Sequence, residues 1–199
     1  MSSSLPANRP RGLTVFFTGL SGAGKSTLAS ALAERLVEAD ARPVTLLDGD
    51  AVRKQISAGL GFSKADRDTH VRRVGQAAAE ISRQGGIAIC ALIAPYANTR
   101  GEVRRLAEAA GEFVLVYMAT PLDVCEQRDA KGLYAKARAG LIQHFTGISD
   151  PYEVPADADI IIDTSHVTPG QATATILDYV NGHGARGAHP LHGDRPTVP

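Results

Sequence analysis

Short apolar runs alternate with longer amphipathic stretches along most of this chain, and this alternation predicts a succession of strands and helices. The apolar runs predict buried strands at 13–17, 43–47, 87–93, 113–118 and 160–162. Between and after them, helical patterns cover 26–39, 51–57, 63–84, 99–110, 122–128 and 168–180. Strands that alternate with helices favour βαβ units and a mostly parallel sheet. The run at 87–93 is the most apolar, so we expect it to be the central strand.

One internal segment and both ends break this pattern. Residues 130–155 are rich in Lys, Arg and Gly and contain no buried-strand pattern, so we interpret them as a mobile lid rather than core. Residues 1–11 are polar and contain Pro, which predicts a flexible N-terminus. Residues 183–199 turn to Gly, His, Pro and Arg, which predicts a disordered tail. The expected organisation is therefore a single folded domain over 12–182.

Composition narrows the class of protein. The 199 residues carry 21 basic and 21 acidic side chains, and this balance argues against nucleic-acid or membrane-surface partners. No apolar run is long enough to cross a bilayer, and the N-terminus lacks an apolar signal core. Cys90 and Cys125 lie far apart in apolar surroundings, which is typical of buried free thiols. We therefore expect a cytoplasmic protein.

The stretch after the first predicted strand carries the clearest chemistry. Gly-Leu-Ser-Gly-Ala-Gly-Lys-Ser-Thr matches G-x-x-x-x-G-K-[ST], a loop whose backbone N–H groups surround phosphate at a helix N-terminus. Lys25 can reach the β- and γ-phosphates, and the Ser26 hydroxyl can bind Mg²⁺. A chance Gly-rich turn is disfavoured by the flanking strand and helix. The candidate nucleotide-binding residues are Gly19, Ser21, Gly22, Ala23, Gly24, Lys25, Ser26 and Thr27.

Phosphoryl transfer also needs an acid, and in a parallel sheet the acid should follow a strand. Asp48 and Asp50 come directly after the strand at 43–47, which makes them the leading candidates. The alternative is that they only form an Asp-Gly turn. Asp163 follows the last strand, and there we favour a structural role.

Cations and aromatic side chains lie near these acids in the sequence. Arg53 and Arg67 flank a Gly-Phe-Ser break, and guanidinium groups suit sulfate and phosphate oxygens, although charged residues often only solvate a helix face. Lys131 in the lid can reach a transferred phosphoryl group. Phe62 and Phe145 lie in polar loops, where they can stack on a flat base or anchor each loop on the core.

Several motifs together resemble the adenylylsulfate kinase (APS kinase) family from about Leu13 to Val180. They are the loop above, Leu-Asp-Gly-Asp, Leu-Gly-Phe-Ser-x-x-Asp-Arg, Pro-Tyr, Lys-Gly-Leu-Tyr-Ala-Lys-Ala-Arg-Ala-Gly and Phe-Thr-Gly-Ile-Ser-Asp-Pro-Tyr-Glu. The resemblance implies a three-layer α/β/α P-loop NTPase fold with a mobile lid. It also implies transfer of the ATP γ-phosphate, with Mg²⁺, to the 3′-hydroxyl of adenosine 5′-phosphosulfate (APS), which forms 3′-phosphoadenosine 5′-phosphosulfate in sulfate assimilation.

The resemblance also implies residue roles. One of Asp48 and Asp50 would orient or deprotonate the ribose hydroxyl, and Ser26 and Asp48 would hold the metal. The catalytic set is Asp48, Lys25, Lys131 and Asp50. The acceptor-binding set is Asp50, Arg53, Phe62, Arg67, His70, Ile93, Pro95, Tyr96, Lys131, Leu133, Phe145 and Thr146. The family is commonly dimeric, and an ATP sulfurylase is an expected partner for some members.

Three positions depart from the family pattern. Ala51 stands where many members have Asn. Ala94 stands where many members have a Ser, which is phosphorylated in some of them. Both changes resemble a branch of the family that is often fused to an ATP sulfurylase. His70 stands where the family usually has an Asn that contacts the acceptor. The alternative function is therefore that of a kinase with the same scaffold that acts on another nucleotide-like acceptor. A GTP-binding switch is disfavoured because no Asn-Lys-x-Asp motif occurs.

Overall fold

A five-stranded parallel sheet forms the centre of the molecule, which we describe from a computed structural model over residues 11–184. The strand order is β2-β3-β1-β4-β5. The strands are β1 (Leu13–Gly19), β2 (Val44–Asp48), β3 (Ile87–Ala91), β4 (Glu112–Met118) and β5 (Ile160–Ile162). The predicted flexible N-terminus, apart from Arg11, and the predicted tail beyond 184 lie outside the described residues.

The predicted central strand, β3, is not the middle one. β3 pairs with β2 and β1, and β1 pairs with β3 and β4, so β1 occupies the middle position. Both β1 and β3 are buried along their whole length. The apolar run of β3 thus correctly indicated an interior strand, but it could not order β3 and β1, because the crossover connections decide that order.

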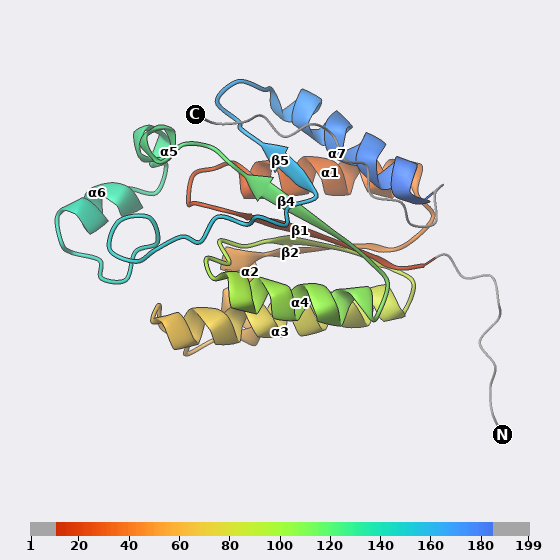
Figure 1. The fold of residues 1–199 in the computed structure, drawn as a ribbon, viewed down its shortest axis with the longest axis horizontal. Helices are drawn as coiled ribbons and strands as arrows, with labels where there is room; N and C mark the ends of the chain where they lie inside the picture. Colours follow the sequence, from red (N-terminus) through yellow and green to blue (C-terminus); the bar gives the residue numbers. More distant parts are fainter. Residues whose placement is uncertain (1–10, 185–199) are drawn as a thin grey trace.

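Helices cover both faces of the sheet, as Figure 1 shows. They are α1 (Lys25–Ala39), α2 (Gly49–Ile56), α3 (Lys64–Arg83), α4 (Ala97–Glu108), α5 (Leu122–Arg128), α6 (Leu133–Arg138) and α7 (Pro169–Gly184). α1 and α7 lie on one face, and α3 and α4 lie on the other. α7 continues two residues past the domain end predicted at 182. Among residues 11–184, no helix is long and apolar enough to cross a membrane.

Successive side chains of the strands pack alternately into two hydrophobic clusters, one on each face of the sheet. Leu13, Val15 and Phe17 of β1 belong to the cluster that includes α1 and α7, whereas Phe16 belongs to the cluster of α3 and α4. This period of two is what a strand buried on both faces requires. The prediction for the cysteines is confirmed, because Cys90 and Cys125 are both free and buried. The three-layer α/β/α class is confirmed as well.

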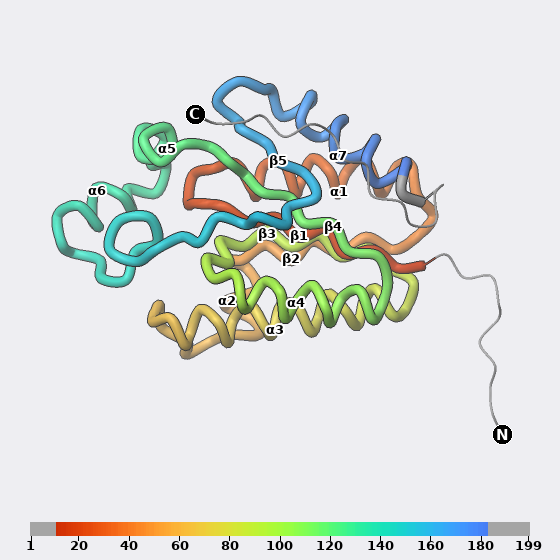
Figure 2. The backbone as a smooth tube through the Cα atoms, in the orientation of Figure 1, coloured from red at the N-terminus to blue at the C-terminus, as the bar shows by residue number. Residues whose placement is uncertain are grey.

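The predicted lid is continuous with the core, which corrects our interpretation of 130–155 as a segment separate from it. Figure 2 shows the chain leaving β4, forming α5 and α6 beyond the end of the sheet, and returning as extended chain to β5. Tyr134 and Ala137 of α6 and Phe145 after it are buried in the core cluster of α1 and α7. Tyr134 and Ala137 are about one helical turn apart and form a short apolar face of α6. The sequence analysis did not detect this face because Lys and Arg residues surround it.

Candidate active site

A cleft of about 580 Å³ runs along the carboxyl ends of the strands. Parallel α/β sheets place their ligands at this edge. The cleft brings together most of the residues that the sequence predicted for the site. These are Ser21, Gly22, Gly24, Lys25, Ser26, Thr27, Asp48, Asp50, Arg53, Phe62, Arg67, His70, Ile93, Pro95 and Lys131.

The phosphate loop joins β1 to α1 and is folded tightly around its own lysine. Gly22 and Gly24 have φ angles of 76° and 93°, in the region that favours glycine. A Cβ at Gly22 would lie 3.0 Å from the Cys125 carbonyl oxygen. Lys25 Nζ donates to the carbonyl oxygens of Gly19, at 2.9 Å, and Leu20, at 2.6 Å. Burial lowers the Lys25 pKa to about 8, although nearby Asp48 acts in the opposite direction.

Asp48 connects this loop to the next strand. Ser26 Oγ donates to Asp48 Oδ2 at 2.6 Å, and the backbone N–H of Asp50 donates to Asp48 Oδ1 at 3.1 Å. Asp48 is therefore also the N-cap of α2. The Asp50 carboxylate pairs with Lys131 from the lid segment. Asp48 thus faces the phosphate loop, while Asp50 faces the lid.

The other end of the cleft carries a ring and two guanidinium groups. The Phe62 ring is 55% exposed, and the guanidinium carbons of Arg53 and Arg67 lie 4.6 Å and 5.5 Å from its centroid. Arg53 Nη1 donates to the Gly61 carbonyl at 2.8 Å, and Arg67 Nε donates to the Phe62 carbonyl at 2.9 Å. Burial lowers the pKa of both arginines, which still leaves them cationic. Such a ring and such cations suit a flat base that carries an anionic group.

His70 lies on α3, near these two arginines, and only 5% of its surface is exposed. Its Nδ1 lies 2.9 Å from Oγ of Ser57, a fully buried residue that ends α2. Burial lowers the His70 pKa to about 4, and the charges of Arg53 and Arg73 add to this effect. The imidazole is therefore neutral at physiological pH, and it offers the cleft one polar nitrogen rather than a positive charge.

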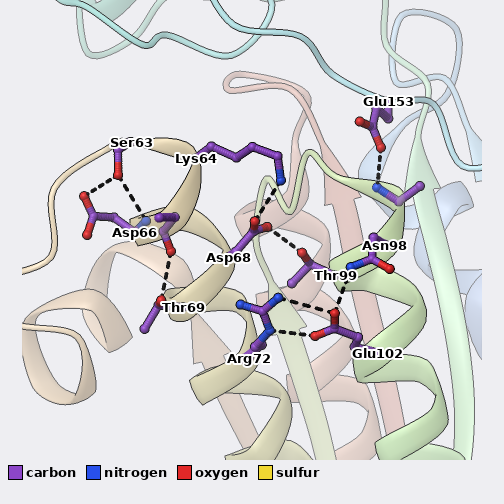
Figure 3. A network of polar contacts seen from close by, with 12 residues as sticks. Ser63, Lys64, Asp66, Asp68, Thr69, Arg72, Asn98, Thr99, Glu102 and Glu153 are labelled. Carbon is purple, nitrogen blue, oxygen red and sulfur yellow. Dashed lines mark hydrogen bonds and ion pairs between the residues drawn. The ribbon is translucent and has the colours of Figure 1, made fainter.

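A polar network that is buried only at Asp68 and Thr99 holds α3, and hence Arg67 and His70, against α4 (Figure 3). Asp68 accepts from Lys64 Nζ at 2.9 Å and from the Thr99 hydroxyl. One turn further along, Arg72 pairs with Glu102 at 2.6 Å. Arg72 therefore pairs with Glu102 at the surface of the helix pair and does not face the cleft. Ser63 accepts from the N–H of Asp66 and begins α3, as the sequence predicted.

Six predicted residues do not line the cleft: Gly19, Ala23, Tyr96, Leu133, Phe145 and Thr146. The Phe145 ring is 8% exposed and packs edge-on against Tyr134, with 5.0 Å between the ring centroids. In this structure Phe145 therefore anchors its loop on the core, and only Phe62 of the pair presents its ring to the cleft. Tyr96 is buried under Lys64, whose Nζ lies 4.0 Å from the ring centroid.

The sequence analysis missed the far end of the cleft, beyond the phosphate loop. This end is lined by Arg128, Thr164, Val167, Thr168, Pro169 and Ala172. Arg128 ends α5, and the others follow β5 or begin α7. None of them belongs to a motif that spacing could reveal, because tertiary packing alone brings the α5 end and the α7 start to the loop. Mixed apolar and cationic groups here suit a nucleotide base.

A parallel α/β/α sheet with a phosphate loop after β1, a strand-end acid and a cationic lid defines a P-loop kinase. Comparison with known proteins narrows this class further. The family model described as adenylylsulphate kinase matches residues 11–163. The chain therefore belongs to the adenylylsulfate kinase family, as the sequence motifs indicated.

Individual relatives agree with this assignment. An adenylyl-sulfate kinase of Synechococcus sp. (strain JA-3-3Ab) is 49% identical over 174 residues, which cover 87% of this chain and 97% of the relative. The APS kinase of Mycobacterium tuberculosis, solved in complex with AMPPNP and APS, has a TM-score of 0.82 and 41% identity, with 86% of this chain and 99% of the other covered. A hexameric APS kinase from Thiobacillus denitrificans has a TM-score of 0.70 and 46% identity, with 88% and 30% covered.

Proposed function

We propose that this protein transfers the γ-phosphoryl group of ATP to the 3′-hydroxyl of APS, releasing ADP and 3′-phosphoadenosine 5′-phosphosulfate. One observation carries the proposal: a single cleft joins the phosphate loop to the cluster of Phe62, Arg53 and Arg67. The cleft therefore offers adjoining sites for two nucleotides, the donor at the phosphate loop and the acceptor at Phe62, with Asp48 between these sites. The family and its relative solved with AMPPNP and APS support the same assignment.

The donor occupies the loop end of the cleft. Backbone N–H groups of the loop and Lys25 hold its phosphates, and the charge of bound phosphate favours the protonated form of this buried amine. The base lies toward Arg128 and Pro169. Ser26 Oγ and Asp48 Oδ2, 2.6 Å apart, are hard oxygen donors that fit Mg²⁺ together with the donor phosphates. Bound there, the ion would neutralise charge that develops on the phosphates.

The acceptor occupies the other end, with its adenine on the Phe62 ring and its phosphosulfate near Arg53 and Arg67. The acceptor hydroxyl then approaches Asp48, whose oxygens already accept from the loop and from α2. Asp48 orients this hydroxyl or takes its proton as the oxygen bonds to the γ-phosphorus and the bond to ADP breaks. Asp50 serves mainly to hold Lys131 in place, and Lys131 can then follow the transferred group.

A second candidate function is phosphorylation of another nucleotide-like acceptor, and His70 is the observation that favours it. The family usually has Asn at this position, whereas here a neutral, buried imidazole bonded to Ser57 borders the acceptor end. An imidazole is larger than a carboxamide, and it cannot offer a donor and an acceptor side by side. The acceptor must therefore be tested directly.

The deciding experiment is a coupled ADP-release assay with purified protein, Mg-ATP and micromolar APS. We expect APS-dependent turnover with little ADP release in its absence. A parallel panel of nucleoside, nucleotide and sugar acceptors separates the two candidates. Turnover with another acceptor and none with APS would reject the first proposal, and phosphorylation of APS alone would reject the second.

Assembly and location complete the proposal. We propose a homodimer, a state common in the family, although the hexameric relative makes a larger assembly an outcome that sedimentation can reveal. An ATP sulfurylase that supplies APS is the expected partner, and co-purification tests it. A cytoplasmic location fits the need for ATP and the two buried free thiols.

A further inference from the structure

Three successive carbonyl groups of the phosphate loop each accept a hydrogen bond from a side chain outside the loop. The Tyr134 hydroxyl donates to Ser21 O at 2.9 Å. Arg128 Nη1 donates to Gly22 O at 3.2 Å. The hydroxyls of Thr120 and Thr164 both lie 3.3 Å from Ala23 O and 2.8 Å from each other. We call these four side chains the outer clamp.

Because a peptide group is planar, fixing the direction of its carbonyl also fixes the direction of its N–H, which can face the phosphate site. Among residues 11–184 no peptide bond is cis, so each carbonyl points opposite to the N–H of the following residue. A carbonyl of Ser21 held outward by Tyr134 therefore turns the N–H of Gly22 to the other side of the chain. The carbonyl of Ala23 does the same for the N–H of Gly24. Both glycines have positive φ and no Cβ, so without an external hold these peptide groups could rotate easily.

We propose that Tyr134, Thr120 and Thr164 are positioning residues that preset the phosphate-binding N–H groups of Gly22 and Gly24 before the donor binds. Peptide groups fixed in advance do not have to be ordered when the phosphates arrive, and this raises donor affinity. The inference deepens the proposed function and rests on it only for the donor, because it makes no use of the identity of the acceptor.

The clamp also ties the loop to the lid segment. Tyr134 lies on α6, and its ring packs against Phe145 from the segment that returns to β5. The carboxylate of Asp129 accepts from the N–H groups of Tyr134 and Ala135, both at 3.0 Å, and so fixes the start of α6. Tyr134 itself is 2% exposed, so it acts on the donor through Ser21 and not by broad contact with the ligand. A displacement of α6 would release the Ser21 carbonyl and weaken the donor site.

The test is Tyr134→Phe, which removes one hydroxyl and keeps the ring that packs on Phe145. Loss of a single hydrogen bond predicts a Kd for Mg-ADP about 5- to 10-fold higher by titration calorimetry. We expect a similar rise in KM for ATP, and a KM for APS within about twofold of the wild type. Thr120→Val is the second variant, because Thr120 is buried outside the cleft lining, and it should weaken donor binding in the same direction.

Tyr152→Phe is the matched control. Its hydroxyl lies 2.9 Å from Oγ1 of Thr18, the β1 residue just before the loop, and not against the carbonyls of Ser21, Gly22 or Ala23. We expect it to lower the melting temperature by a few degrees at most and to leave the Kd for Mg-ADP unchanged. If Tyr134→Phe and Thr120→Val bind Mg-ADP like the wild type, or if the control weakens binding as much as they do, the proposal is wrong. Because the readout is donor binding, failure of the wild type to phosphorylate APS would reject only the proposed acceptor.

Discussion

The two ends of the cleft are built in different ways. At the donor end, one continuous stretch from Gly19 to Thr27 supplies the end of β1, the phosphate loop and the first turn of α1, and we expect it to hold phosphate mainly through backbone groups. At the acceptor end, Arg53, Phe62, Arg67 and His70 come from α2, from the turn after it and from α3. These residues act through their side chains.

This difference predicts how each end responds to change. A backbone cradle depends on local geometry and on the groups that hold it, so single side chains matter less there, with Lys25 as the exception. A side-chain site depends on helices that keep their relative positions, as the bonds from Asp68 to Lys64 and Thr99 do for α3 and α4. The donor end should therefore tolerate most substitutions of exposed side chains, whereas the acceptor end should be sensitive to conservative ones.

The largest effect is expected for Lys25→Ala at the donor end. Removing the only side-chain cation of the loop should lower turnover by about 10³-fold or more, because its charge acts on the phosphoryl group in transit. The ADP-release assay measures the loss. Lys54→Ala, an exposed lysine on α2 outside the cleft lining, is the control and should stay near the wild-type rate. Comparable losses in both variants would contradict a special role for Lys25.

Asp48→Asn tests the boundary between the two ends. Asn retains the ability to cap α2, but it loses the negative charge that can orient or accept the proton of the hydroxyl. We expect kcat to fall by about 10²- to 10⁴-fold while the Kd for Mg-ATP changes by only a few fold. Asp163→Asn, which changes the other strand-end acid, should leave kcat almost unaltered. Near-wild-type turnover of Asp48→Asn would refute its assigned role.

Arg67→Lys tests the acceptor end with charge conserved. Lysine cannot reproduce the fork that bonds the carbonyls of Phe62 and His144 together with an acceptor anion. We expect KM for APS to rise by about 10- to 100-fold, with KM for ATP nearly unchanged. Arg72→Lys on the same helix should have little effect on either constant. An equal rise in both KM values for Arg67→Lys would show that the two ends are not independent.

The smallest effect is a pH dependence of stability that originates at the acceptor end. The folded-state pKa of His70 is about 4, below its ordinary value, so between about pH 4 and 6.5 the unfolded chain binds more protons. Stability therefore rises with pH across this window and falls on acidification, by about 2 kcal/mol from pH 7 to 5. Urea unfolding of the wild type and His70→Asn at both pH values measures the difference. Equal pH slopes in the two proteins would contradict a neutral, buried imidazole.

Local patterns predicted much of this molecule, because their causes are local. Strands buried on both faces read as apolar runs. The start of α3 at Ser63 and the glycines of the phosphate loop follow from backbone geometry within a few residues. The acids also followed from position, since carboxyl ends of parallel strands share one edge of a sheet. The alternation of elements was thus enough to place Asp48 near Lys25.

Contacts between distant segments were decided only by the tertiary structure. The middle position of β1 depends on crossovers, and the burial of Tyr134 and Phe145 depends on a core assembled from other elements. Arg128 and Thr164 meet at the phosphate loop although 36 residues separate them, so no pattern in the sequence predicts their contact. The phosphate loop could be located from its sequence motif alone. The side chains that bond to the carbonyls of this loop could be identified only from the fold. Such hydrogen bonds depend on proximity in space, and they produce no periodic pattern in the sequence.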